Sequence, residues 1–93
     1  MSNELLVGVY IDTMIVSYKP WFLIIRKRLL NETGHICVEK FLHMLKEYNA
    51  YFIDQHENEI KLLSDCQDVY NTFVRKIVFD TLEDMIIFKL KWC

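Results

Sequence analysis

Five consecutive hydrophobic residues, Trp21 to Ile25, follow Pro20 and constrain the fold more than any other feature of the sequence. Pro20 suits the first turn of a helix, because its missing N–H group would have no partner there. Five successive side chains, about 100° apart, point in every direction around a helix. One layer of sheet buries only part of that circumference. We therefore expect a helix over residues 20–32 that also contacts a second helix or another chain.

The chain is short for the amount of hydrophobic surface that it has to bury. It has 93 residues, of which 53% are hydrophobic and 14% aromatic. A domain of this size buries only roughly 60–65% of the surface of its unfolded chain. A disordered chain would be poor in aromatic residues, so the sequence predicts one compact domain over residues 1–93. Part of its hydrophobic surface is then left for a partner, either another protein or a second copy in a homodimer.

The charge balance and the cysteines narrow the partners and the compartment. A formal net charge of −2 disfavours a nucleic-acid-binding domain, which is usually basic, although a local basic patch would still bind phosphates. Cys37, Cys66 and Cys93 are odd in number and lack paired spacing, so they do not form a disulfide framework. The N-terminal residues lack the basic start of a secretory signal. We therefore expect a cytoplasmic, intracellular protein.

Neither hydrophobic run of the sequence is long enough to cross a membrane. A transmembrane helix needs about 20 apolar residues. Asp12 ends the run Leu5–Ile11, and Arg26 ends the run Trp21–Ile25. The sequence therefore predicts that the chain has no membrane partner.

Hydrophobic periodicity predicts the other elements of the fold. Leu5–Ile11 is rich in β-branched residues and predicts a strand that is buried on both faces. Met14–Val16 either extends this strand or forms a second short one. Further helices are expected over residues 38–48 and 66–79, and further strands over 50–54, 59–63 and 85–92.

Polar residues mark several of these boundaries. Asn49 would end the helix 38–48 in a left-handed conformation, and Ser64 and Asp65 would cap the helix 66–79. The resulting element order is β-α-α-β-β-α-β, which matches a ferredoxin-like sandwich. We therefore predict an α+β fold, a small ferredoxin-like or related sandwich with an antiparallel sheet and two or three helices.

The histidines and cysteines do not form a recognisable metal motif. His35 and Cys37 are close together, but structural zinc sites usually combine two close pairs of ligands. We interpret Cys37 and Cys66 as small hydrophobic side chains in or beside the core. The sequence also lacks a Gly-rich phosphate-binding loop. It therefore predicts no cofactor, no metal and no enzymatic activity.

Three aspartates support an alternative function. Asp12 and Asp54 end predicted strands, and Asp80 follows the predicted helix 66–79. A carboxylate directly after a buried strand can hold a divalent ion for phosphodiester cleavage. The alternative is therefore a nucleic-acid-binding domain or a metal-dependent nuclease of ferredoxin-like type that uses Asp12.

Aromatic and basic residues support the main hypothesis, which is a protein interface. Trp and Arg dominate the energetics of protein interfaces. A basic cluster directly follows the run Trp21–Ile25, and the predicted strand 85–92 ends in a tryptophan. The cluster is either an ordinary solvated face or a contact for phosphates or an acidic protein surface. The candidate interface residues are Trp21, Phe22, Arg26, Lys27, Arg28 and Trp92.

The function expected from these features is binding without catalysis. The chain would be a small protein-binding domain that acts through an apolar and aromatic surface. It would serve as an adaptor, or as an inhibitor of a larger complex of the kind that viruses and phages encode, with self-association as one form of such binding.

Overall fold

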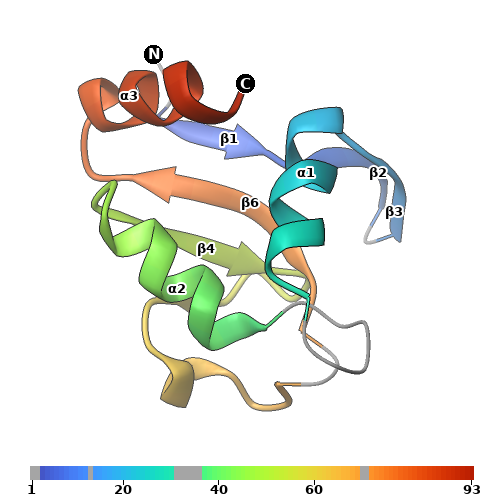
Figure 1. Ribbon diagram of the computed structural model, residues 1–93. Helices are drawn as coiled ribbons and strands as arrows, with labels where there is room; N and C mark the ends of the chain where they lie inside the picture. Colours follow the sequence, from blue (N-terminus) through green and yellow to red (C-terminus); the bar gives the residue numbers. More distant parts are fainter. Residues whose placement is uncertain (1–2, 13, 31–36, 70–71) are drawn as a thin grey trace.

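The structure is a computed structural model that describes residues 3–12, 14–30, 37–69 and 72–93 (Figure 1). The strands are β1 (Glu4–Leu6), β2 (Gly8–Ile11), β3 (Met14–Tyr18), β4 (Ala50–Asp54), β5 (Glu59–Ile60) and β6 (Val74–Phe79). The helices are α1 (Pro20–Arg28), α2 (Val38–Lys46) and α3 (Leu82–Trp92), with a short 3-10 helix, η1 (Leu63–Asp65).

The main sheet is antiparallel and has the strand order β1-β6-β4-β5. β6 comes late in the chain, yet it lies between β1 and β4 and pairs with both. Figure 1 shows α2 in front of β4, with α1 and α3 on the same side of the sheet. β2 and β3 form a separate two-stranded sheet beside α1, which we call the hairpin.

The core lies between the main sheet and the helices. Leu5 and Phe52 pair with Ile77 from opposite sides, so the three side chains share the inner face of the sheet. Each helix adds a buried phenylalanine to the same cluster: Phe22, Phe41 and Phe88. The rings of Phe41 and Phe52 are 5.4 Å apart, and edge-to-face and tilted ring pairs of this kind stabilise a core beyond simple burial.

The run Leu5–Ile11 does not form the single buried strand that was predicted. The chain changes sheet at Val7, whose side chain is buried and whose carbonyl accepts the N–H of Lys19 at 2.9 Å. β1 stays in the main sheet, whereas β2 leaves it and exposes Val9 and Ile11. The prediction of burial on both faces is therefore wrong for β2, and also for β1, which exposes Leu6. The alternative of a second short strand after residue 13 is confirmed by β3.

Gly8 is the position where the two strands of the hairpin come closest. A Cβ atom at this residue would lie 2.4 Å from the carbonyl oxygen of Ser17 and 2.8 Å from Cδ1 of Ile15. The carbonyl belongs to the paired backbone and cannot move without breaking the pairing, which is why the strand needs glycine here.

We expect Gly8→Ala to destabilise the protein by about 2–3 kcal/mol, the typical cost of forcing an extra carbon into a packed site. Urea unfolding followed by circular dichroism measures the change. Ser17→Ala, which keeps the same carbonyl, is the control and should cost less than about 0.5 kcal/mol. A Gly8→Ala variant with the wild-type unfolding midpoint would show that the hairpin tolerates the Cβ atom.

The elements with a strong local pattern are confirmed. α1 begins at Pro20 as predicted and ends at Arg28; residues 31 and 32 of the predicted helix lie outside the described residues. α2 confirms the second helix, and Asn49 has a φ of 52°, which is left-handed as expected. β4 and β5 form the predicted hairpin, with β5 ending at Ile60. The α+β class, with its antiparallel sheet and three helices, is also confirmed.

The predicted helix over residues 66–79 is wrong, since its second half is the strand β6. Asp65 does not cap a helix after it. Its carboxylate instead accepts the N–H groups of Leu62 at 2.9 Å and Lys61 at 3.0 Å. Both donors precede η1, so Asp65 caps the start of this short helix. These two hydrogen bonds lower the pKa of Asp65. Because the Asp65 carboxylate accepts hydrogen bonds from residues that precede it, it is not available to cap a helix that would follow it.

The predicted strand over residues 85–92 is also wrong, because this segment is the helix α3. Thr81 caps it: its hydroxyl oxygen accepts the N–H of Asp84 at 3.1 Å and its hydroxyl donates to the Asp84 carboxylate at 2.9 Å. Acidic residues lie in the first turn and lysines in the last, which is the charge distribution that favours a helix dipole. The chain therefore ends in a strand and then a helix, the reverse of the predicted order, and a ferredoxin-like order is not established.

Candidate functional site

Large hydrophobic side chains that stay exposed gather mainly on two surfaces of the described chain. One comprises the outward faces of α1 and α3, with Leu23, Ile24, Ile86, Ile87 and Leu90. The other comprises the hairpin and the residue before β6, with Val9, Ile11, Met14, Val16 and Phe73. Contiguous exposed apolar surface of this kind usually marks a contact with another molecule.

α3 is hydrophobic on both of its sides. Met85 and Phe88 face the core and are buried, whereas Ile86, Ile87 and Leu90 lie on the opposite side and are exposed. Leu90 is 83% exposed. A helix on the surface of a protein normally presents polar residues to water. The outward face of α3 is therefore a candidate for contact with another molecule.

α1 and α3 meet at two tryptophan side chains. The ring of Trp21 lies 5.8 Å from that of Phe88 in an edge-to-face arrangement, and the Arg28 guanidinium lies 5.3 Å above the ring of Trp92. Ile24 is three residues after Trp21 and four before Arg28, so all three lie along one side of α1. The two helices therefore meet through the side of α3 that carries Phe88 and Trp92, with Ile24 on the side of α1 that makes this contact.

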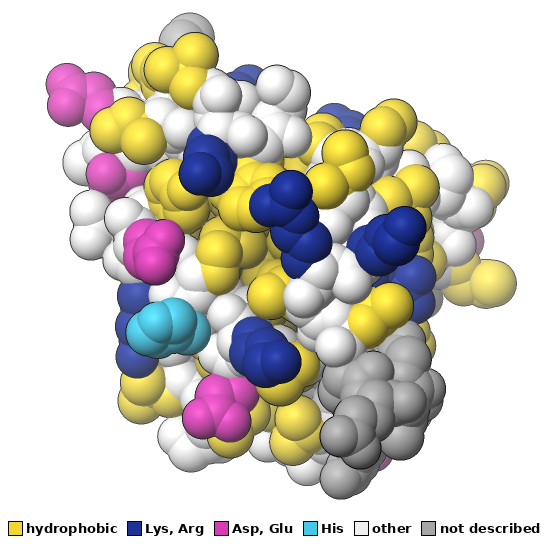
Figure 2. Space-filling view, viewed as in Figure 1, with side chains coloured by type: hydrophobic (Ala, Val, Ile, Leu, Met, Phe, Trp, Pro, Cys, Tyr) yellow, Lys and Arg dark blue, Asp and Glu magenta, His cyan; other side chains and the backbone are white. Residues whose placement is uncertain are grey.

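Positive charge concentrates around this junction. Six of the chain's 11 Lys and Arg residues are Lys19, Arg26, Lys27, Arg28, Lys89 and Lys91, and residues 19–31 and 85–93 contain no acidic residue. Among the described residues, the ion pairs Lys61–Glu59 and Lys76–Glu4 lie elsewhere. Figure 2 shows dark-blue cations among yellow hydrophobic side chains over α1, with carboxylates toward the left and below.

We call this region the cationic helix surface. It comprises the exposed apolar residues Leu23, Ile24, Ile86, Ile87 and Leu90 and the cations Lys27, Arg28, Lys89 and Lys91. Glu83 and Asp84 lie at the other end of α3, in its first turn. The positive charge of this surface therefore lies on α1 and on the C-terminal half of α3.

Among the predicted interface residues, Phe22 has to be corrected. Its side chain is 1% exposed and packs against Tyr18 and Phe41, so it belongs to the core. Trp21 and Trp92 are half-buried and pack against the core with only part of each ring at the surface. Trp21 and Trp92 therefore lie at the boundary between the core and the candidate surface.

The three predicted basic residues have different environments. The Arg26 guanidinium lies 5.5 Å above the ring of Tyr18 and its side chain is half-buried, whereas Lys27 and Arg28 are exposed. Arg28 contacts Trp92 as described above. Of the predicted residues, the structure therefore brings Trp21, Arg28 and Trp92 to one junction.

Sequence reasoning missed Ile86, Ile87 and Leu90, because it assigned residues 85–92 to a strand. A strand places Ile86 and Ile87 on opposite faces, whereas a helix places Ile86, Ile87 and Leu90 on one face. The signal that would have identified them is Thr81 followed three residues later by Asp84, the pattern of a capped helix N-terminus.

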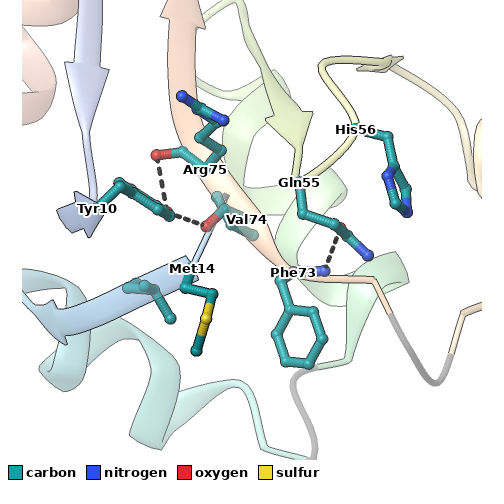
Figure 3. A pocket seen from close by; sticks show the side chains of 8 residues that line it. Tyr10, Met14, Gln55, His56, Phe73, Val74 and Arg75 are labelled. Atoms are coloured by element: carbon teal, nitrogen blue, oxygen red, sulfur yellow. Dashed lines mark hydrogen bonds between the residues drawn. The ribbon is translucent and has the colours of Figure 1, made fainter. Parts of the chain in front are cut away.

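A cleft of about 390 Å³ lies between the hairpin and the start of β6 (Figure 3). Its walls are mostly apolar, with Ile15 on the hairpin and Phe73 on the opposite side, where the Gln55 side-chain oxygen accepts the Phe73 N–H at 2.9 Å. The Tyr10 hydroxyl lies 2.7 Å from the carbonyl oxygen of Val74 and 3.1 Å from that of Arg75. This contact holds the hairpin against β6.

Burial raises the pKa of Tyr10 to about 12, with the neighbouring Tyr18 adding to the rise and Arg75 opposing it. The folded state therefore keeps the phenol proton up to about pH 12, whereas the unfolded chain releases it near pH 10. Between these values the unfolded state binds fewer protons, so stability falls as the pH rises.

We expect Tyr10→Phe to cost about 1 kcal/mol at pH 9, because it removes the hydrogen bond to β6. The difference in the free energy of unfolding between wild type and variant should become smaller as the pH approaches 12. Only the wild type has a phenol whose pKa is raised by folding, so only the wild type loses stability through it over this range. Urea unfolding at pH 9, 10 and 11 measures it. A constant gap would contradict the raised pKa.

Among the described residues, the carboxylates and cysteines show no arrangement that would hold a metal. Asp12 is exposed in the hairpin turn with a φ of 56°. Asp54 is buried, and its carboxylate accepts the N–H groups of His56 and Asn58 at 2.9 and 2.8 Å. No group of three His, Cys, Asp or Glu side chains within residues 3–12, 14–30, 37–69 and 72–93 is placed to share an ion. The nuclease alternative therefore gains no support, and His35 lies outside the described residues.

The chain matches no protein-family model, and no curated protein and no solved structure is detectably similar to it. In the described part of the chain, no helix is long and apolar enough to cross a membrane.

Proposed function

We propose that this chain is a non-catalytic protein-binding domain and that the cationic helix surface is its binding site. The observation that supports this most directly is the outward face of α3, where Leu90 is 83% exposed beside Ile86 and Ile87. Burying one such side chain against a partner contributes about 1.5–3 kcal/mol. Exposure of this face to water is therefore unfavourable, and contact with another protein would stabilise it.

The charges indicate the chemistry of the partner. Lys27 and Arg28 on α1 and Lys89 and Lys91 on α3 border the apolar side chains. A segment that fits this surface presents apolar side chains in its centre and carboxylates at its margin, as an acidic amphipathic helix does. Complementary charge of this kind steers the encounter and suppresses the wrong partners.

The two tryptophans make the proposal directly measurable. The chain has 2 Trp residues, and both Trp21 and Trp92 lie at the α1–α3 junction, where the latter contacts Arg28. Intrinsic tryptophan fluorescence therefore reports from the proposed site without any label. A partner that covers the junction excludes water from both rings and shifts their emission to shorter wavelength.

The test is a fluorescence titration with a designed helical peptide of leucine and glutamate. The control is the same peptide with every glutamate replaced by lysine. We expect saturable binding of the acidic peptide only. Its affinity should fall steeply between about 50 and about 500 mM salt, because the screening length shortens from about 14 to about 4 Å.

Two further probes separate the alternatives. Phosphatidylcholine–phosphatidylserine vesicles test a membrane surface, and a single-stranded oligonucleotide tests nucleic acid. Binding to either of these without binding to the acidic peptide would overturn the proposal, as would equal binding of the acidic and basic peptides.

A further inference from the structure

We infer that the second exposed apolar surface, formed by the hairpin and Phe73, is a self-association surface that a second copy of this chain covers. This inference concerns other residues than the proposed function, and either can fail without the other.

The outward face of the hairpin is apolar and has no neighbour in the described chain. The register places Ile11 opposite Met14 and Val9 opposite Ser17, so these side chains share one face. Val9, Ile11, Met14 and Val16 are each at least 55% exposed. The opposite face carries Gly8, Tyr10, Ile15 and Tyr18, which are buried or half-buried.

The outer edge of the hairpin is also open. In the described residues, β3 pairs with β2 and with no other strand. β3 also lacks the lysine, proline or inward charge that usually protects an exposed edge, since its sequence is Met-Ile-Val-Ser-Tyr.

The near absence of charge on this face favours a second copy as its occupant. Between residues 5 and 18 the only charged residue is Asp12, which lies in the turn. Two copies of this face therefore meet without repulsion. Two copies of the cationic helix surface would instead bring like charges together, which favours a different, acidic partner there. A two-fold contact needs a self-complementary patch, and an uncharged apolar face meets that condition.

The cleft beside the hairpin lies against its inward face, which carries Tyr10 and Ile15, and reaches the outward face at Met14. Met14 and Phe73 border the same cleft (Figure 3), and Phe73 is exposed. Arg75 also borders it, so the margin of the surface carries one acid, Asp12, and one cation. A standard interface buries about 800 Å² on each partner, which is more than four hairpin side chains provide. The contact therefore has to continue from Met14, at the end of the hairpin, onto the exposed side chain of Phe73.

Sedimentation equilibrium of the whole chain tests the inference. We expect the mass of a dimer for the wild type, unchanged or tighter at high salt because the contact is apolar. Val9→Glu should weaken the dimer at least about 100-fold, since each copy would bury an unpaired charge. Ile24→Glu is the matched control, because Ile24 is 54% exposed on α1 and Val9 is 55% exposed on β2. The control should stay dimeric.

A second measurement does not depend on the stability of any variant. Isotope-filtered NMR of mixed labelled and unlabelled wild-type chains detects contacts between copies. We expect such contacts from the methyl groups of Val9, Ile11 and Met14. The inference is overturned by a wild-type monomer at millimolar concentration, by a Val9→Glu dimer as tight as the wild type, or by contacts from the α3 methyl groups in place of those of the hairpin.

Discussion

Phe88→Ala is expected to remove most of the stability of this protein, with a loss of about 3–5 kcal/mol. Phe88 is fully buried, and its ring lies 5.2 Å from Tyr48 and 5.3 Å from Phe79. It also contacts Trp21 and Trp92. One side chain therefore connects α3 with α1, with the end of α2 and with the central strand β6. Its removal leaves a cavity that three helices and a sheet would have to close together.

The measurement is urea unfolding of the wild type and of Phe88→Ala, with Ile87→Ala as the control on the next residue of the same helix. Ile87 is exposed, so its truncation should change the free energy of unfolding by less than about 0.5 kcal/mol. Domains of this size are typically stable by about 5–10 kcal/mol, so Phe88→Ala should be close to unfolding at 37 °C. Equal effects of the two variants would place residue 88 outside the core.

The elements that the sequence predicted correctly are those in which one periodicity fits and the other does not. In α2, buried Val38, Phe41, Leu42 and Leu45 recur at helical spacing, and the residues between them are polar or partly exposed. In β4, five residues rich in aromatic and β-branched side chains are bounded by Asn49 and a polar turn. The local sequence determines the secondary structure of these segments, so the prediction from the local sequence was correct.

Residues 66–79 failed because their pattern fits two periods. Phe73, Val74 and Ile77 recur at helical spacing, but Ile77 and Phe79 also lie on one side of a strand. β6 pairs with β1 and β4 at once, and pairing on both edges outweighs the helical spacing. Those partners lie about 70 and 25 residues earlier in the chain, so no local pattern shows them.

Residues 85–92 failed for the opposite reason, since they are hydrophobic in nearly every position. In a half-buried strand, apolar residues alternate with polar ones. Here Ile86, Phe88 and Leu90 alternate with Met85 and Ile87, which are also apolar, so the two-residue period carried little information about the secondary structure. The cap at Thr81 was the decisive local signal. The error mattered for function, because the strand hid the outward face of α3.

The apolar excess was located in part by the sequence alone. The run Trp21–Ile25 was expected to need a second contact, and the structure buries Phe22 and Ile25 while exposing Leu23 and Ile24. Tertiary contacts therefore decide which side chains of this uniformly hydrophobic run lie in the core and which lie at the surface. Which residues fall on which side depends on where α3 and the sheet lie, and that follows from the long-range pairing of β6.

Leu90→Glu is expected to weaken binding of the acidic leucine–glutamate peptide at least about 100-fold and to leave the fold unchanged. Leu90 is 83% exposed, and Glu forms helices nearly as well as Leu, so the free energy of unfolding should change by less than about 0.5 kcal/mol. Binding loses the burial of a leucine, about 2 kcal/mol, and gains repulsion between the new carboxylate and the acidic peptide.

Leu90→Lys separates these two effects. It loses the same apolar contact but adds a charge that attracts the peptide, so its affinity should fall less, by about 10-fold. Its dependence on salt should be steeper than that of the wild type, because one more cation contributes. Leu62→Glu, which places the same charge on an exposed leucine beyond β5, should bind as the wild type does. If Leu90→Glu binds as tightly as Leu62→Glu, the outward face of α3 is no part of the binding site. If Leu90→Lys and Leu90→Glu weaken binding equally, the contact is apolar alone and the surrounding lysines and arginines do not select the partner.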